Sequence, residues 1–296
     1  MHRLTALLLL PLLLLAGCAG PASAAPPAGP LPEPITVVFL NAGKADCTLL
    51  LSGGSAFLID AGTNKTGKQL ASLLQKLQIT SLEGLLITHF DKDHVGGADK
   101  ILASVPVKAV YEPDYPAEGK QTEQYRAALQ AAGLVPTVIS QNTTIPFAGT
   151  TLQVDVINAA TRPEAQENDY SLALFLAAGE HSFFFTGDAE RPRLAEWLGD
   201  GAGECTVLKM PHHGVVEKNT GAFLDRAAPS YAVITCSDDE PEEQETLSLL
   251  YTRQVQTYLT RNGTVVFHTD GHILTVCQLE DVENVWSLSA LQEEIK

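Results

Sequence analysis

The sequence has few basic side chains for its length. Its 296 residues include 19 Lys and Arg against 35 Asp and Glu, which gives a formal net charge of −16 at pH 7. Such a surface repels the phosphate backbone of nucleic acids at long range. The composition therefore argues against tight non-specific DNA binding, although it leaves open a phosphate site centred on metal ions.

The sequence also lacks closely spaced cysteines. Besides Cys18 there are four cysteines, and none has a partner at Cys-x-x-Cys spacing, which argues against a zinc ribbon. Each of these four lies in or beside a predicted strand, so we expect buried free thiols. An extracytoplasmic location would also permit a disulfide, whose pairing the sequence does not define. The four residues are Cys47, Cys205, Cys236 and Cys277.

No internal repeat is present, and the apolar run at the N-terminus is short. "MHRLTALLLLPLLLLAGC" contains Pro11 and has the length of a signal-peptide core rather than of a membrane span. It ends in Leu-Ala-Gly-Cys, which resembles a bacterial lipobox. We therefore predict a lipoprotein signal peptide over residues 1–17, cut before a lipidated Cys18. The alternative is an ordinary signal peptide with a chance cysteine.

A diacylated Cys18 would hold the mature chain on the outer leaflet of the membrane, because two acyl chains suffice for stable binding. The protein is thus expected to be extracytoplasmic and lipid-anchored to the bacterial cell membrane. Residues 18–34 are rich in Pro, Ala and Gly, which predicts a semi-extended tether. Removal of Arg3 with the signal would make the net charge one unit more negative. The folded domain is predicted over residues 35–296.

Strand and helix patterns alternate along this domain. Short strands are predicted at 35–43, 47–53 and 55–62, and later hairpins at 143–160 and 171–188. Strand–helix units follow each β-rich part, and the last long helix is predicted over 245–259. Two mixed sheets with helices outside would form an α/β sandwich, with polar strand ends meeting at one edge.

One loop concentrates metal-ligand side chains. "ITHFDKDHVGG" places His89, Asp91, Asp93 and His94 within six positions, after an apolar strand and before Gly96-Gly97. Imidazole and carboxylate groups suit Zn²⁺, Mn²⁺ or Fe. A solvated loop with chance charges is the alternative, but it would rarely hold these four residues at this spacing.

Two later motifs carry the same residue types at strand ends. Asp188 follows an apolar strand in "FFFTGDAE", and His212 and His213 follow another in "LKMPHHG". A lone Thr-Gly-Asp is a common turn, and a lone His-His pair is more often structural. The three motifs together, in this order and each at a strand end, are much more specific for a metal centre.

The ordered set resembles the metallo-β-lactamase (MBL) fold superfamily. More narrowly it is similar to the hydrolase domain of ComEC-type DNA-uptake competence proteins and their stand-alone secreted relatives, which carry His-x-Asp-x-Asp-His-x-Gly-Gly. "FLNAGKADCTLL", "ENDYSLAL" and "VVFHTDGHI" resemble further segments of those proteins, so that the likeness covers about residues 35–278. It implies an αβ/βα four-layer sandwich with two mixed β-sheets and two divalent metal ions, Zn²⁺ or Mn²⁺.

The resemblance also implies roles for individual residues. His89 and Asp91 would hold a first metal, and Asp93, His94 and His213 a second. Asp188 would bridge the two metals, and His212 would support the centre or contact a leaving or phosphoryl oxygen. The residues predicted to act in catalysis are Asp93, Asp188 and His212. Further ligands or supporting residues are expected among Asp46, Asn168 and Asp169.

The activity that this resemblance implies is hydrolysis by water activated at two metals, with Asp93 as a proton acceptor. We predict a nuclease or phosphodiesterase acting on a phosphodiester substrate such as nucleic acid. The alternatives are amide or ester hydrolysis, including β-lactams, and a non-catalytic binding lipoprotein. The acidic "SDDEPEEQE" lacks the histidine that relatives often carry after the corresponding strand, which places negative charge near the expected cleft mouth.

Overall fold

The computed structural model describes residues 31, 33–200 and 203–280. The predicted signal peptide, Cys18, most of the tether and the C-terminal residues 281–296 lie outside this range. The first strand begins at Ile35, where the folded domain is predicted to start. Among the residues described, no helix is both long and apolar enough to cross a membrane.

The first sheet has eight strands in the order β15-β14-β1-β2-β3-β4-β5-β6. Pairing is antiparallel from β15 to β3 and parallel from β3 to β6. The strands are β1 (Ile35–Phe39), β2 (Thr48–Ser52), β3 (Ser55–Ile59), β4 (Gly84–Leu86), β5 (Val110–Pro113), β6 (Thr137–Ile139), β14 (Thr264–Thr269) and β15 (Leu274–Leu279).

The second sheet has seven strands in the order β13-β12-β11-β10-β9-β8-β7. Here β7 to β10 pair antiparallel, and β10 to β13 pair parallel. The strands are β7 (Thr143–Phe147), β8 (Thr150–Asp155), β9 (Ala173–Ala178), β10 (His181–Phe185), β11 (Val207–Lys209), β12 (Tyr231–Ile234) and β13 (Gln256–Leu259).

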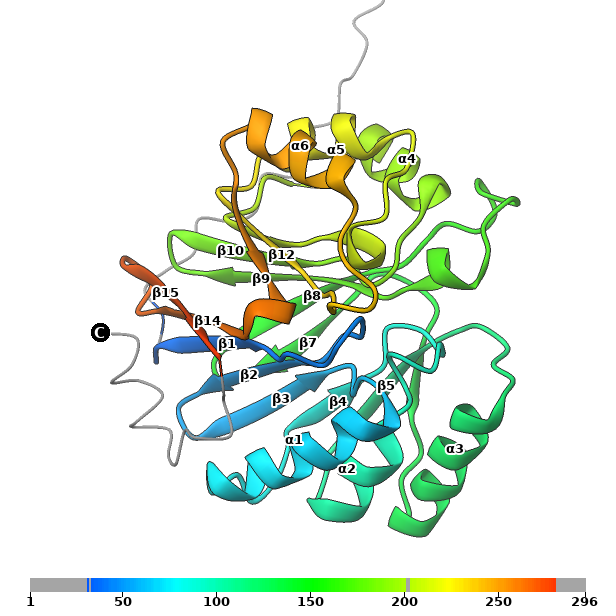
Figure 1. Ribbon diagram of the computed structural model, residues 1–296. Helices are drawn as coiled ribbons and strands as arrows, with labels where there is room; N and C mark the ends of the chain where they lie inside the picture. The colour runs from blue at the N-terminus through cyan, green and yellow to red at the C-terminus, as the bar shows by residue number, and fades with distance from the viewer. Residues whose placement is uncertain (1–30, 32, 201–202, 281–296) are drawn as a thin grey trace, which may run out of the picture.

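Helices cover the outer face of each sheet (Figure 1). On the first sheet these are α1 (Asn64–Lys76), α2 (Ala98–Ser104) and α3 (Lys120–Ala132). On the second they are α4 (Arg191–Asp200), α5 (Thr220–Ala227) and α6 (Gln244–Thr252). Three 3₁₀ turns span η1 (Glu167–Tyr170), η2 (Pro211–Gly214) and η3 (Thr260–Asn262). The four-layer αβ/βα sandwich implied by the sequence is therefore confirmed.

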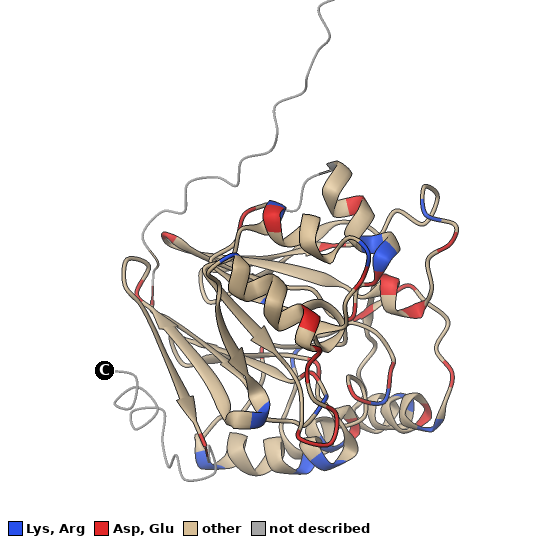
Figure 2. Ribbon diagram, turned by 45° about the horizontal axis from the view of Figure 1, so that its top comes forward, with Lys and Arg blue, Asp and Glu red and all other residues tan. Residues whose placement is uncertain are grey.

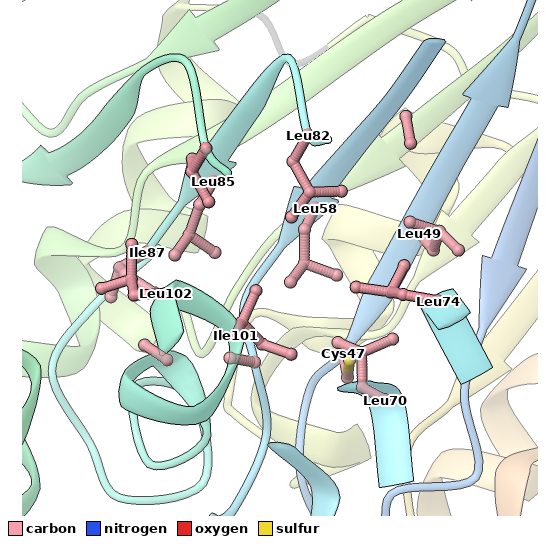
Figure 3. Close-up of a cluster of buried hydrophobic side chains, with 14 of the residues drawn as sticks. Cys47, Leu49, Leu58, Leu70, Leu74, Leu82, Leu85, Ile87, Ile101 and Leu102 are labelled. Atoms are coloured by element: carbon pink, nitrogen blue, oxygen red, sulfur yellow. The ribbon is translucent and has the colours of Figure 1, made fainter. Parts of the chain in front are cut away.

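The period-two alternation of the strands divides the core into layers. On β1, Val37 and Phe39 point into the space between the sheets, where Phe39 packs against Phe185 and Phe267. Val38 points the other way, into the layer beneath the helices of the first sheet. Figure 3 shows this second layer, with Leu58 of β3 close to side chains of α1 and α2. These rigid layers fix the strand ends that carry the polar motifs.

The predicted helix over residues 245–259 is wrong in its second half. The helix α6 ends at Thr252, and Gln254 then takes a left-handed backbone with φ 59°. The β-branched and aromatic residues that follow form β13, which pairs parallel with β12. The apolar spacing of "LLYTRQVQTYL" therefore covers two elements, and the left-handed residue between them has no strong sequence signature.

Of the cysteines in the folded domain, Cys47, Cys205 and Cys236 are free thiols, as predicted. Cys47, Cys205 and Cys236 are buried, and Cys277 is half-buried. Burial raises the pKa of the Cys205 thiol to about 12, so this group is inert at neutral pH.

Candidate metal centre

The polar motifs meet because of strand direction. Strands β3 and β4 run parallel in one sheet, and β10 and β11 run parallel in the other. The residues after their carboxyl ends include His89 after β4, Asp188 after β10, and His212 and His213 after β11. Side chains at such ends gather at one edge of the sandwich, which is where the sequence analysis places the centre.

Two glycines close the loop that carries the first motif. A Cβ atom at Gly96 would lie 2.1 Å from the carbonyl oxygen of Lys92, and one at Gly97 would lie 2.2 Å from that of Ala61. No side chain fits at either position without moving the backbone. The Gly-Gly pair therefore lets this loop pack directly against the end of β3, as its sequence position suggests.

Four side chains form a compact cluster, which we call the inner group: Asp93, His94, Asp188 and His213. The Asp188 carboxylate lies between two imidazoles, with Oδ1 3.3 Å from His94 Nε2 and Oδ2 3.1 Å from His213 Nε2. His213 Nε2 is also 3.4 Å from Asp93 Oδ2. Asp188 thus contacts two of the residues predicted to hold the second metal.

Buried imidazole nitrogens without partners point into this cluster. Nε2 of His89, of His94 and of His213 is buried, and none has a hydrogen-bond partner among the described residues. Buried polar atoms are normally satisfied, because an unmade hydrogen bond carries a desolvation penalty. Three such nitrogens beside carboxylates fit a divalent metal ion, and ligand atoms of Asp46, His94, Asp188 and His213 all lie within 4.8 Å of one another.

The opposite nitrogen of each ring lies beside a buried oxygen. His94 Nδ1 donates to Asp60 Oδ2 at 2.8 Å, and His213 Nδ1 lies 2.8 Å from Thr235 Oγ1 and 3.1 Å from its carbonyl oxygen. His89 Nδ1 lies 3.3 Å from Ser171 Oγ. Because carboxylate and carbonyl oxygens only accept, Nδ1 of His94 and of His213 carries the proton and leaves Nε2 free for a metal.

The sequence analysis missed the supporting residue Asp60. Its oxygens accept hydrogen bonds from the backbone and hydroxyl of Thr88 at 2.8 and 2.7 Å, in addition to the bond from His94. Asp60 takes a left-handed backbone with φ 56°, which turns the chain sharply after β3. A signal for it exists, since "FLIDAG" places an aspartate near a glycine at the end of an apolar strand, as "FFFTGD" does with Asp188.

The charges of the cluster are strongly coupled. Burial and the neighbouring His94 hold the pKa of His89 well below its usual range, which keeps His89 neutral. For Asp93, burial alone would raise the pKa, but the contact with His213 at 3.4 Å and the charge of His94 outweigh it and lower the pKa to about 2. For His213, burial alone would lower the pKa, yet Asp188 outweighs it and raises the pKa to about 9. In the metal-free protein, His213 is therefore protonated at neutral pH, and its positive charge lies where a metal cation would also be stabilised.

The low pKa of Asp93 bears on its predicted roles. A carboxylate that stays ionised down to about pH 2 is well suited to bind a cation and is a weak proton acceptor. This low pKa fits the ligand role of Asp93 better than proton transfer.

Asp46 is committed to other partners. Its Oδ2 lies 2.5 Å from Lys209 Nζ, and its Oδ1 accepts from Thr235 Oγ1 at 2.7 Å. Lys209 Nζ also donates to the carbonyl oxygen of Gly187 at 2.9 Å and lies 3.3 Å from Asp188 Oδ1. Lys209 lies within the "LKMPHHG" motif, where the sequence predicted no role for it.

The predicted first metal position is more open. His89 Nε2 and Asp91 Oδ2 are 3.8 Å apart, and the Asp91 side chain is 48% exposed. We call these two residues the outer pair. The His89 ring lies 4.0 Å, centroid to centroid, from that of His94, so the outer pair adjoins the inner group.

Asn168 and Asp169 have structural partners. The Asn168 side-chain amide donates to Glu190 Oε1 at 2.9 Å. Asp169 is fully buried, and its oxygens accept from the backbone N–H groups of Gln166, Glu190 and Arg193. Of the two readings that the sequence left open, these bonds favour loop orientation over metal ligation.

His212 lies at the rim. Its Nε2 is 4.0 Å from Asp188 Oδ2, its Nδ1 is 3.4 Å from Glu190 Oε1, and its side chain is 25% exposed. Since Glu190 and His212 are both accessible, this ring is able to meet a substrate that the buried ligands cannot reach.

The acidic segment "SDDEPEEQE" follows β12 and Thr235, the residue directly after that strand. Arg261 offsets part of its charge, with bonds to Glu242 at 2.9 and 3.0 Å and to Asp238 at 3.4 Å. Figure 2 shows acidic residues along the loops between the two helical layers. The side of the molecule that carries these loops therefore retains negative charge.

The four-layer sandwich, with a buried histidine and carboxylate cluster at its strand ends, defines a class of metal-dependent hydrolases. The model of the Metallo-beta-lactamase superfamily matches residues 40–237, and the chain belongs to this superfamily. It is a metal-dependent MBL-fold hydrolase, and its predicted divalent-metal binding agrees with the cluster.

Curated relatives confirm the narrower resemblance to competence proteins. The chain is 25% identical to ComE operon protein 3 of Bacillus subtilis, over 70% of this chain and 27% of that protein. It is 28% identical to Recombination protein 2 of Haemophilus influenzae, over 66% of this chain and 23% of that protein. The chain thus corresponds to about a quarter of the length of these relatives.

Among solved structures, the chain resembles the MBL-fold protein YhfI of Bacillus subtilis. The TM-score is 0.56 at 12% identity, over 80% of this chain and all of that one. This likeness supports the fold alone.

Proposed function

We propose that this protein hydrolyses phosphodiester bonds at a centre of two divalent metal ions. The observation that carries the proposal is the position of the buried Asp188 carboxylate, 3.3 Å from Nε2 of His94 and 3.1 Å from Nε2 of His213, with the buried His89 ring adjoining that of His94. The residues that would hold the metals are the inner group and the outer pair.

The charge of the centre supports two metals rather than one. The centre contains five carboxylates, those of Asp46, Asp60, Asp91, Asp93 and Asp188, and one ammonium group, that of Lys209. With neutral histidines this leaves four formal negative charges, which two divalent cations neutralise. A single divalent ion would leave an anionic pocket, and such a pocket repels a phosphodiester.

When bound, two divalent metals would lower the pKa of water and take up negative charge that develops on a phosphoryl oxygen. The chain itself then has three tasks. Asp188 and the imidazoles hold the two positions together, and Asp60 and Thr235 keep the rings oriented. His212 lies at the rim, where we propose that it contacts the leaving oxygen.

The ligand set supports a phosphodiester rather than an amide. Asp91 stands where many superfamily members carry histidine, and oxygen-rich sites favour harder cations such as Mn²⁺ alongside Zn²⁺. The names of the curated relatives concern competence and recombination, which supports a nucleic-acid-related substrate for this chain. Candidates are nucleic acid fragments, nucleotides, and phosphate-bearing wall or lipid head groups.

We propose further that the enzyme works outside the cytoplasm, anchored through Cys18 and the tether 18–34. The sequence "LLLLAGC" and the Pro- and Ala-rich stretch after it support this location. The Cys18→Ser variant should lose radiolabelled palmitate and leave the membrane fraction. Retention of the label in this variant would contradict lipidation at Cys18.

The function is tested with purified residues 19–296. Bound metal is measured first, and then hydrolysis of bis(p-nitrophenyl) phosphate, plasmid DNA and nitrocefin with added Mn²⁺ or Zn²⁺. We expect about two metals per chain and metal-dependent cleavage of the phosphodiesters. Turnover of nitrocefin alone would replace the proposal by β-lactam hydrolysis. If almost no metal is bound and no substrate is turned over, the remaining hypothesis is a non-catalytic binding lipoprotein.

A further inference from the structure

A buried lysine lies directly behind the metal-binding cluster. Lys209 ends β11, is 2% exposed, and has its amino group between two carboxylates, 2.5 Å from Asp46 Oδ2 and 3.3 Å from Asp188 Oδ1. Burying an ammonium group is costly unless it is paired and hydrogen-bonded. The position of this charge beside a bridging carboxylate therefore calls for a specific role.

The lysine belongs to a connected ring of contacts. From Lys209 one path runs directly to Asp188. The other runs through Asp46 and Thr235 to Nδ1 of His213, whose Nε2 returns to Asp188 at 3.1 Å. Two residues of the inner group are thus joined through one internal ion pair.

The backbone of Lys209 is also held by hydrogen bonds and strand pairing. Lys209 pairs with Phe185 across the parallel strands β10 and β11, and its carbonyl oxygen accepts from Thr186 Oγ1 at 2.7 Å. Its ammonium group donates to the carbonyl oxygen of Gly187, the residue before Asp188. The amino group therefore has a defined position relative to the bridging carboxylate.

We propose that Lys209 is an internal counter-cation of the metal centre, and that Asp46 serves as its anionic partner rather than as a metal ligand. Lys209 compensates Asp188 when no metal is bound and so keeps the inner group assembled. It is a positioning residue, because its amino group is buried away from any substrate. This inference rests on the metal centre of the proposed function but not on the identity of the substrate.

Electrostatics gives the sign of the effect. The ammonium and a bound metal ion compensate the same carboxylate, and like charges a few ångströms apart repel. Lys209 therefore stabilises the metal-free protein more than the metal-bound protein. Replacing it by a neutral side chain of similar length should lower stability without metal, yet tighten metal binding. Removing Asp46 instead leaves the ammonium to compete for Asp188 and weakens metal binding.

The test compares Lys209→Met, Asp46→Asn and the double variant with the wild type, all as residues 19–296. Zn²⁺ and Mn²⁺ affinities are measured by competition with a fluorescent chelator, and Tm is measured with and without metal. We expect Lys209→Met to bind about tenfold tighter or more, with a larger metal-induced rise in Tm. Asp46→Asn should bind more weakly, and the double variant should return close to the wild type.

The double variant keeps the test decisive if Lys209→Met fails to fold, because removing both members of a buried ion pair is often tolerated. A double variant as weak in metal binding as Asp46→Asn would make Asp46 a ligand and overturn the inference. So would Lys209→Met with unchanged or weaker affinity, since a purely structural lysine destabilises both states equally.

The control is Lys108→Met, the same change at an exposed lysine paired with Glu83, which should leave metal affinity unchanged. Failure of the proposed function is distinguished within the same data. If the wild-type protein binds no metal, the proposed metal centre itself is wrong. If the wild-type protein binds metal but cleaves no phosphodiester, the proposed activity is wrong, while the affinities of the variants still test the role of Lys209.

Discussion

The inner group and the outer pair are built differently, although they lie side by side. In the inner group, His94 and His213 are fixed through Nδ1 by Asp60 and Thr235, and Asp188 joins their opposite nitrogens. In the outer pair, the Asp91 side chain is 48% exposed. Burial and the nearby Asp93 raise the pKa of this carboxylate.

This difference teaches that the two metal positions are unequal before any metal arrives. The side chains of the inner position are already ordered, so little conformational entropy is lost when they bind a cation. The outer position depends on an exposed carboxylate that must first become ordered. We therefore expect the inner position to fill first and more tightly, with the outer metal setting the dependence of activity on metal concentration.

The largest effect is expected where the two positions meet. Asp188→Ala removes the carboxylate between the imidazoles, so metal content should fall and hydrolysis of bis(p-nitrophenyl) phosphate should drop by about 10³-fold or more. Circular dichroism should show an intact fold. If the folded variant stayed active, the assignment of the centre would be wrong.

The next largest effect is expected at Asp60, which orients His94 of the inner group. Asp60→Asn keeps the left-handed turn at φ 56°, because asparagine tolerates it, but removes the charge that orients His94. Metal affinity should weaken by about 10–100-fold, as measured by chelator competition. The matched control is Asp99→Asn on α2, whose affinity should equal that of the wild type. Equal affinities for Asp60→Asn and the control would show that the inner group does not need this carboxylate.

The outer pair should respond more mildly. Asp91→Asn should lower metal content by about one ion per chain and activity by about tenfold, with the inner position still filled. Asp91→His, which offers a softer ligand, should raise affinity for Zn²⁺ relative to Mn²⁺. Elemental analysis after dialysis decides the first point. Loss of both metals from Asp91→Asn would contradict the inequality of the two positions.

The protons that occupy the inner group predict a pH dependence. The pKa of His213 is raised to about 9 in the folded chain, against 6.5 when unfolded. Its protonated form therefore stabilises the metal-free fold fully below pH 6.5, and this contribution is lost as pH rises through about 9. Tm of the metal-free protein should fall by several degrees over this range. Because metal displaces the proton, the rise in Tm on adding Zn²⁺ should grow with pH.

The smallest effect is expected at Asn168, which lies outside both predicted metal positions. Asn168→Ala removes a hydrogen bond to Glu190, which lies beside His212 at the rim. We expect kcat/KM to fall by about threefold, the loss of one partly exposed hydrogen bond, with metal content unchanged. A fall in metal content would instead restore Asn168 as a ligand.

The sequence predicts much of the fold because its motifs stand at strand ends. The order of hairpins and strand–helix units identifies two mixed sheets, and "HFDKDH", "TGD" and "HHG" lead to residues that the structure brings together. This works because a rigid strand fixes the side chain that follows it. The helix predicted through Gln254 fails for the opposite reason, because a single backbone angle decided the boundary.

The supporting network is harder to predict than the ligands. Asp60, Thr235 and Lys209 come from three different strand ends and gain meaning only through long-range contacts such as Thr235 to Asp46. A lone Asp, Thr or Lys after an apolar run is too common to single out. The electrostatic coupling that fixes the charge of each imidazole is likewise a property of the assembled cluster.

The turn that carries the two adjacent histidines limits how this protein can change. His212, His213 and Gly214 all have left-handed backbones, with φ of 45°, 53° and 80°. This backbone places consecutive rings on different sides of the centre, one at the rim and one inside. Gly214 is tied in turn to Thr246 of α6 through its carbonyl oxygen. Insertion or deletion of one residue here would displace both rings together, so the length of this turn is expected to be fixed.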